Sequence, residues 1–325
     1  ASTAAITVDN TAGTCTANIT NNLSNRNLII NGAMQVAQRG TSGTTTSSGY
    51  VACDRMRFSL SGLDEGITVA QSALTSSDTP YTKGFRYATK ITNGNQTSGA
   101  GATDTINLMY RLEGQDINGS GWEYTSASSF VTISFWIKSS VAQTFYLRFR
   151  MTGSSVVKEF VSAISATTSW QKITKTIPGA TGVDSVNTTG EGGFVQITLF
   201  RGTDQTGSMT IDQWNTHDAS AKVPDMTSTW YTTNDATMEL TGLQMEVGSV
   251  ATDFEHRSFA QELQLCKRYY ETFTPNLFCL QTWFVNLTTA KNQYMFEVEK
   301  RANPTCSTSG TFNSSNGYAN TPSFA

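Results

Sequence analysis

Apolar and polar residues alternate most strictly between residues 130 and 200. In two runs every second side chain is apolar: Val131, Ile133, Phe135 and Ile137, and then Phe145, Leu147, Phe149 and Met151. The residues between those of the second run, Tyr146, Arg148, Arg150 and Thr152, are polar or amphipathic. A period of two is typical of strands that bury one face. Both runs are therefore predicted to be half-buried strands.

The same pattern recurs before and after these two runs. Further strands are predicted over 156–164, 170–177 and 194–201, and an earlier one over 27–38 with a turn at Asn31-Gly32. Clusters of Gly, Ser, Thr and Asn separate them, as in antiparallel sheets. Because each strand must bury one face against a second sheet, the predicted fold is an all-β antiparallel sandwich.

A change of phase marks the strand near residue 240. Met238 and Leu240 alternate in one phase and the apolar residues of 243–247 in the other, with Gly242 between them. One extra residue shifts the register of a strand by one position, so a bulge at Gly242 would return all these side chains to one face. Two separate strands are the alternative.

One amphipathic helix is predicted from Ser258 to about Thr272. Ser258 and Gln261 have the spacing of a capping box, and Pro275 follows the run. An apolar stripe, predicted to be buried on a sheet or a neighbouring chain, consists of Phe259, Leu263, Cys266, Tyr270 and Phe273. Beyond the helix, 277–286 and 293–300 are predicted to form a second β pair.

These patterns divide the 325 residues into four parts. Residues 1–25 hold few apolar side chains and are predicted to be an arm that makes its ordered contacts with another chain. The sandwich follows over 26–257, the helix over 258–274, and a small β unit with a loose tail over 275–325.

Charge and hydropathy exclude two classes of partner. The net charge is -3 and only 14% of the residues are charged, so the chain lacks the basic field that holds a nucleic acid. Its apolar runs are far shorter than the roughly 18 residues that a membrane-spanning helix needs. Neither nucleic-acid binding nor membrane insertion is expected.

Metal and redox chemistry find little support in the sequence. The five cysteines, Cys15, Cys53, Cys266, Cys279 and Cys306, are scattered and lack the spacing of metal ligands. They are expected to be free thiols that pack as small apolar groups. No zinc site and no cofactor is predicted.

Catalytic motifs are also missing from the sequence. His217 and His256 are the only histidines, and we expect the first to be a solvated loop residue and the second to form hydrogen bonds before the helix. A glycosidase needs two carboxylates about 5 to 10 Å apart, which a sequence cannot reveal. Unsupported candidates for such a pair are Asp64, Glu65, Asp116, Glu191 and Asp204.

Aromatic residues among hydroxyl and amide side chains indicate a different function. Rings of this kind stack on sugars while their neighbours bind sugar hydroxyls. The predicted ligand-binding residues are Trp122, Tyr124, Trp214, Trp230 and Tyr231. The alternative is that these rings cover an edge of the sandwich or a subunit interface. Trp136 and Trp170 lie within predicted strands and are expected to be packing residues.

Two parts of the chain resemble a known family. The opening 27–40, NLIINGAMQVAQRG, with Tyr50 and Asp54-Arg55 behind it, resembles the start of a domain of tailed-bacteriophage tail fibre and receptor-binding proteins. The segments 240–248, 254–258 and 262–270 resemble its closing block. The resemblance spans about residues 26 to 305, including 301–305. It implies a virion protein in a tail appendage, assembled as a homotrimer.

The middle of the chain is similar to carbohydrate-binding modules of the galactose-binding jelly-roll type. The segments 133–139 and 169–172 stand where those modules have central strands, which implies a two-sheet jelly roll. The closing strand 243–247 lacks the Asp pair found near a structural calcium in many such modules. Met56 also replaces the aromatic residue expected after Asp54-Arg55.

The leading hypothesis is a non-enzymatic virion protein, a tail fibre or similar appendage, that mediates adhesion to a host surface glycan. Its expected partners are two further copies of itself, other virion proteins bound through the arm, and the glycan. A scaffold protein that decorates the capsid or tail without a ligand is one alternative, and a glycan depolymerase is another.

Overall fold

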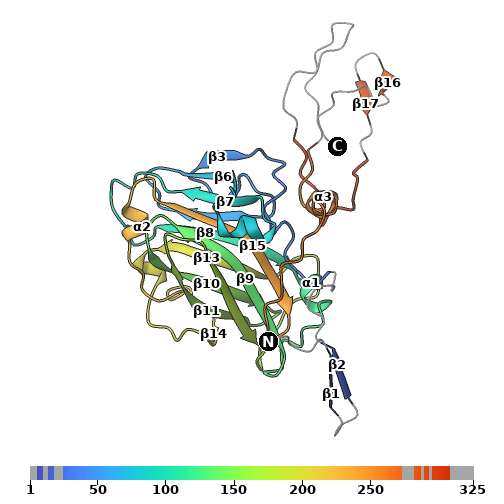
Figure 1. Ribbon diagram of the computed structural model, residues 1–325. Coiled ribbons are helices and arrows are strands. Elements are labelled where there is room, and N and C mark those ends of the chain that lie inside the picture. The colour runs from blue at the N-terminus through green and yellow to red at the C-terminus, as the bar shows by residue number, and fades with distance from the viewer. Residues whose placement is uncertain are drawn as a thin grey trace.

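The computed structural model describes residues 25–272 and 295–307 in full, together with the backbone of four further strands. These four strands form two separate pairs: β1 (Ile6–Asp9) with β2 (Thr14–Ala17), and β16 (Thr282–Asn286) with β17 (Thr289–Asn292). All other strands belong to two large sheets that pack face to face (Figure 1). The arm's contacts with another chain stay a prediction.

Both large sheets are antiparallel, which confirms the predicted all-β sandwich. The seven-stranded sheet has the order β14 (Trp214–Thr216), β11 (Val157–Ala166), β10 (Gln143–Thr152), β13 (Glu191–Arg201), β8 (Thr105–Glu113), β5 (Arg57–Ser61) and β4 (Gly49–Tyr50). The six-stranded sheet has the order β12 (Gln171–Pro178), β9 (Phe130–Ser139), β15 (Thr237–Val247), β7 (Tyr87–Thr92), β6 (Ile67–Ala73) and β3 (Ser42–Thr45).

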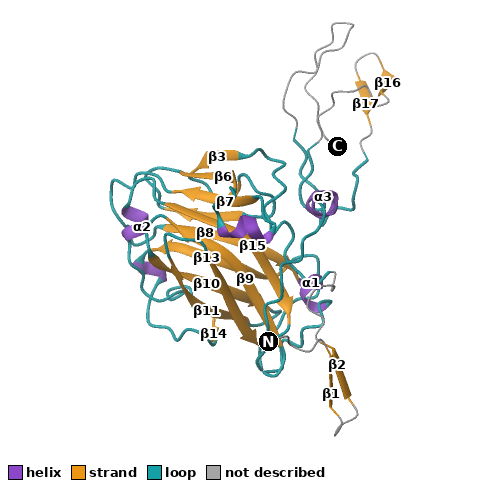
Figure 2. Ribbon diagram, viewed as in Figure 1, coloured by secondary structure: helices purple, strands orange, loops and turns teal. Residues whose placement is uncertain are grey.

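Short helices lie around the sandwich rather than within it (Figure 2). They are the 3-10 helices η1 (Thr79–Lys83) and η2 (Thr203–Gln205) and the α-helices α1 (Gly114–Asn118), α2 (Thr229–Thr232) and α3 (Phe259–Lys267). No helix in the described part of the chain is long and apolar enough to cross a membrane.

The core forms where the alternating pattern predicts it. The eight apolar side chains of the two runs, in β9 and β10, are all completely buried between the sheets. Strand β10 pairs with β11 on one side and β13 on the other, so its inward residues lie in the middle of the sheet. Full burial of a large apolar side chain contributes about 1.5–3 kcal/mol, which makes these strands a main source of stability.

The predicted bulge in β15 is confirmed. The pairing of β15 with β9 shifts register between Thr241 and Gln244, and Gly242 has a φ of 65°. Met238 and Leu240 before the bulge, and Leu243 and Met245 after it, are all buried. Val247, at the end of the strand, is 39% exposed.

Replacing Gly242 with alanine is expected to destabilise the sandwich strongly. A Cβ atom there would lie 2.7 Å from the Phe85 ring, in a backbone conformation with positive φ. The backbone cost is about 1–2 kcal/mol, and overpacking adds about 1–3 kcal/mol. Gly121→Ala is the matched control because Gly121 has a φ of 82° and open space around it. Equal losses in urea unfolding for the two variants would contradict the predicted clash.

The predicted strand over 27–38 is wrong: this segment forms turns and extended coil outside both sheets. Asn31 has a φ of 60°, and its side chain bonds the backbone N–H and carbonyl of Val36 and the carbonyl of Asp54. Because one amide side chain bonds these backbone groups, the segment folds around Asn31 instead of pairing as a strand.

Helix α3 begins as predicted but buries a face that only partly overlaps the predicted stripe. Ser258 is its N-cap and forms the capping box with Gln261. The helix ends at Lys267, before the predicted Thr272, and Phe259 is 55% exposed, so the predicted buried stripe is wrong there. Leu263 and Tyr270 are half-buried and Phe273 lies outside the described residues. The buried side chains of α3 are Glu262 and Cys266.

The C-terminal β pair differs from the prediction in its second strand, which is β17 at Thr289–Asn292 rather than 293–300. Cys53 and Cys266 are buried free thiols and Cys306 is exposed. The side chains of Cys15 and Cys279 lie outside the described residues.

Candidate functional site

A polar pocket lies on the outer face of the seven-stranded sheet. It has a volume of about 240 Å³ and is lined by side chains from β5, β8, β10 and β13 and from the segment 205–222. Arg148 of β10 lies opposite Gln196 of β13, which lies opposite Met109 of β8. We call this the outer-face pocket.

Polar side chains on this face are withdrawn from water. Arg148 is 3% exposed, Gln196 1% and Arg201 5%. Outward side chains of an antiparallel sheet usually face solvent. Here the chain after β13 returns over the sheet, where Val223 packs against Tyr146 and Val161.

A hydrogen-bond network crosses the floor of the outer-face pocket. Gln196 donates to the side-chain oxygen of Asn107 at 2.8 Å, and Arg201 donates to the same oxygen at 3.3 Å. Arg201 and Lys222 both donate to the side-chain oxygen of Gln205, Lys222 at 2.7 Å. The network fixes the segment after β13 against the sheet.

One carboxylate, Glu159 of β11, lies beneath the outer-face pocket and is fully engaged. Arg148 forms a two-pronged ion pair with it, with Nε at 2.9 Å from Oε2. His217 Nδ1 lies 2.6 Å from Oε1 of the same carboxylate. His217 is a loop residue, as expected, but it is half-buried against this carboxylate rather than fully solvated. His256 does form the expected junction hydrogen bond, from Nε2 to the carbonyl of Lys83 at 2.9 Å.

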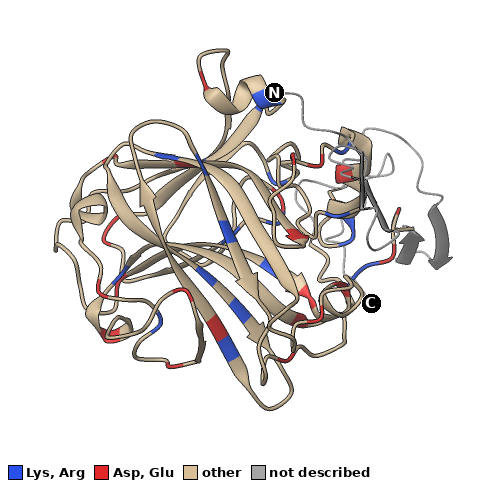
Figure 3. Ribbon diagram, turned by 60° about the horizontal axis from the view of Figure 1, so that its bottom comes forward, with Lys and Arg blue, Asp and Glu red and all other residues tan. Residues whose placement is uncertain are grey.

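Three cations of the outer-face pocket lack a carboxylate partner. Within the described residues no acidic oxygen lies within 4.0 Å of a side-chain nitrogen of Arg150, Arg201 or Lys222. The Nε atoms of Arg150 and Arg201 are buried without a hydrogen-bond partner. Figure 3 shows Lys and Arg positions on neighbouring strands of the sandwich.

Burial and mutual repulsion act on these cations. Burial, followed by the positive charges of Arg201, Arg148 and Arg150, lowers the pKa of Lys222 to about 8. Burial and Arg148 also lower the pKa of Arg201, although a guanidinium stays protonated at neutral pH. The outer-face pocket is therefore an electropositive site with free donors.

Three of the five predicted sugar-binding rings are buried, so the prediction is wrong for them. Trp122 is 4% exposed and Trp230 and Tyr231 are completely buried. The indole of Trp230 donates to the carbonyl of Thr237 at 3.1 Å. Tyr231 stacks on Phe200, with ring centroids 4.2 Å apart. A ring without an accessible face cannot stack on a sugar.

The other two rings, Tyr124 and Trp214, are half-buried. Tyr124 donates to the side-chain oxygen of Asn118 at 2.9 Å and meets Trp122 edge to face. Trp214 donates to the carbonyl of Pro178 at 2.7 Å and contacts Phe149. Both rings pack against the core between the sheets, and their part in ligand binding stays a prediction.

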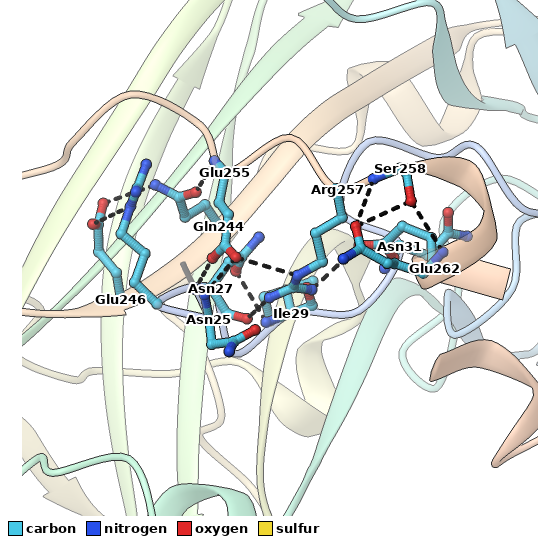
Figure 4. Close-up of polar contacts among 12 residues, drawn as sticks. Asn25, Asn27, Ile29, Asn31, Gln244, Glu246, Glu255, Arg257, Ser258 and Glu262 are labelled. Atoms are coloured by element: carbon cyan, nitrogen blue, oxygen red, sulfur yellow. Dashed lines mark hydrogen bonds and ion pairs between the residues drawn. The ribbon is translucent and has the colours of Figure 1, made fainter. Parts of the chain in front are cut away.

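The residues of the phage-like resemblance converge on the junction between the sandwich and α3. Glu255 accepts hydrogen bonds from the backbone N–H groups of Asn25 and Asn27, and Arg257 donates to the carbonyl of Ile29 and to Glu262 (Figure 4). The opening and closing segments are thereby joined. We call this network the terminal clasp.

A second pocket of about 200 Å³ lies beside the terminal clasp, where Tyr269 and Tyr270 follow α3. Arg55 lies 3.4 Å from the centre of the Tyr269 ring, and Arg39 lies 3.5 Å from that of Tyr270. Arg268 binds Glu113 through two hydrogen bonds of 3.0 and 2.9 Å. These contacts hold the end of α3 on the sandwich.

Three of the five carboxylates considered as candidates for a catalytic pair bind other groups of the chain. Asp64 accepts from the backbone N–H and hydroxyl of Ser98, and Glu65 from the backbone N–H of Asn95. Glu191 pairs with Arg111 at 2.9 Å. Burial and Glu113 raise the pKa of Asp116.

Asp204 lies in η2, and no carboxylate lines the outer-face pocket. Among the described residues no group of three His, Cys, Asp or Glu side chains is placed to hold a metal ion.

Similarity to known proteins is confined to distant solved structures. Neither a family model nor a curated protein matches the sequence. One structural neighbour is the enzymatically active domain of tailspike protein 4 of bacteriophage CBA120, at 9% identity and a TM-score of 0.35. That match covers 68% of this chain and 21% of the tailspike chain, so this chain spans about a fifth of that neighbour.

Two carbohydrate-binding modules are further neighbours. The family 11 module of the cellulosomal cellulase Lic26A-Cel5E of Clostridium thermocellum has 11% identity and a TM-score of 0.31, covering 66% of this chain and 98% of the module. The CBM22-1 xylan-binding domain of Paenibacillus barcinonensis Xyn10C has 11% identity and a TM-score of 0.29, covering 66% and 99%. Likeness at this level carries no argument about ligand or activity.

Proposed function

We propose that the chain is a non-enzymatic virion protein, a tail fibre or similar appendage, that adheres to a glycan on the host surface. The observation that carries the glycan-binding part is the outer-face pocket, in which hydroxyl, amide and guanidinium groups meet on a sheet face. Sugar recognition needs such converging donors and acceptors. The virion part is supported by the resemblance of the opening and closing segments.

The outer-face pocket fits one sugar residue better than a long chain. Its volume of about 240 Å³ is below the roughly 300–1,000 Å³ of pockets that enclose drug-sized ligands. A small site buries little surface and binds weakly, so adhesion would depend on several copies acting together. The homotrimer implied by the phage-like resemblance would supply those copies.

Blocking the pocket tests the proposed function. Ser61 lies on the exposed rim of the outer-face pocket, so Ser61→Trp is expected to fill the entrance without changing charge. Ser42→Trp is the matched control, because Ser42 is an exposed residue of β3 in the other sheet.

Glycan-array binding and adsorption to host cells are expected to fall with Ser61→Trp and to persist with Ser42→Trp. Wild-type binding by both folded variants would refute the assigned site. Release of reducing ends from a bound glycan would instead support a depolymerase.

A further inference from the structure

The outer-face pocket holds more positive charge than the neighbouring carboxylate of Glu159 can offset. Arg148, Arg150, Arg201 and Lys222 line it, and no acidic residue does. Glu159 beneath it is bound by Arg148 and His217. Three cations therefore remain in a partly dry site, where charges interact more strongly than in water.

Two of these cations also have unused donors. The Nε groups of Arg150 and Arg201 are buried and unpartnered, while Arg201 as a whole is 5% exposed. A buried donor without a partner costs about 1–3 kcal/mol, and more when the group is charged. An anion with several oxygens would accept from both guanidinium groups and offset their repulsion at the same time.

We propose that the outer-face pocket selects glycans that carry an anionic substituent, a carboxylate, sulfate or phosphate, and that Arg150, Arg201 and Lys222 bind this group. The inference rests on the proposed function and specifies its ligand class. Guanidinium groups match the planar geometry of carboxylates and the oxygens of sulfate and phosphate. The hydroxyl groups of Ser59 and Ser61, which also line the pocket, are placed to bind the neutral hydroxyls of the sugar ring.

The pH dependence follows from the groups that face Lys222. These are Arg201, Arg148, Arg150, Glu159 and His217, and the cations outweigh the carboxylate. The pKa of Lys222 is lowered to about 8, so the amine is charged below that pH and neutral above it. Affinity for an anionic glycan is therefore expected to fall as the pH rises through 8.

The experiment compares the full chain on glycans that share a backbone and differ in charge. The probes are oligogalacturonate, its neutral methyl ester, and an array holding sialylated and sulfated glycans beside their uncharged parents. Lys222→Gln is expected to weaken binding of the charged glycan about five- to tenfold. Lys172→Gln, an equal charge change at an exposed residue of β12, is expected to leave binding unchanged.

Each outcome separates this inference from the proposed function. Binding of neutral glycans that Ser61→Trp abolishes would keep the proposed function and overturn the anionic class. Charged-glycan binding that Lys222→Gln and Arg150→Gln both leave intact would also overturn it.

A second measurement tests the anion site even if no glycan on the array binds. Sulfate titrated onto chain with ¹³C-methylated lysines is expected to shift the Lys222 resonance. A shift without any glycan binding would support the anion site and refute glycan adhesion, whereas no shift would overturn the inference.

Discussion

Trp230→Ala is expected to lower the free energy of unfolding by about 3–5 kcal/mol, the usual loss for truncating a buried tryptophan. The Trp230 ring is completely buried against Phe145, with ring centroids 6.0 Å apart, and its backbone N–H donates to Gln143. Truncation would leave a cavity between the sheets where α2 closes the end of the sandwich. The melting temperature should fall by about 6 to 20 °C for a domain of this size.

The same substitution separates a structural ring from a sugar-binding one. Replacing a ring that stacks on a sugar would lower adsorption and leave stability unchanged. Trp230→Ala should instead lower adsorption only as far as it unfolds the chain. Phe259→Ala is the control, because Phe259 is 55% exposed and should change stability by less than about 0.5 kcal/mol. Wild-type unfolding of Trp230→Ala in urea, with adsorption lost, would contradict the structural role.

The sandwich could be predicted because its strands bury one face and expose the other. In β9 and β10 every second residue is apolar, and those residues are the core. The bulge in β15 was also visible, because an extra residue at Gly242 brings the apolar side chains of both phases onto one face. Both features depend on residues close together in the sequence, so the alternation of apolar and polar residues predicts them.

The candidate site could not be predicted in the same way. Arg148 and Arg150 have the alternation expected of solvated positions on an outer face, and nothing in β10 shows that the chain after β13 returns to cover them. Trp230 and Tyr231 stand among polar residues and resemble a surface loop. Their burial arises because α2 closes the end of the core, which is a long-range packing event.

Helix α3 illustrates a third kind of error. Its apolar stripe suggested an apolar partner, but the surface it meets is the terminal clasp, where Asn31 and Arg257 bind Glu262. Burial raises the pKa of Glu262, and the hydrogen bond from Asn31 and the charge of Arg257 oppose that rise. The polar partner shifted the buried face so that Glu262 is buried beside Cys266 of the predicted stripe, while Phe259 is exposed. Periodicity alone cannot show this partner.

The buried ion pair beneath the outer-face pocket should be as sensitive as the core. Glu159 is 1% exposed, and Arg148→Gln removes the guanidinium that pairs with it. Breaking one side of a buried pair costs about 3–5 kcal/mol. Replacing both residues, as Arg148→Met with Glu159→Leu, is expected to recover most of that stability because neither member of the pair is left as a buried charge without its partner. Urea unfolding of the single and double variants measures the difference.

Glu159→Gln gives the sharper result, because it removes the carboxylate and leaves Arg148 beside Arg150, Arg201 and Lys222. The expected loss is again about 3–5 kcal/mol, and sulfate should restore more stability to Glu159→Gln than to Lys172→Gln. Sulfate stabilises most folded proteins through exclusion from their surfaces, so the excess over Lys172→Gln isolates binding to the crowded cations. An equal response of the two variants to sulfate would mean that these cations do not bind it.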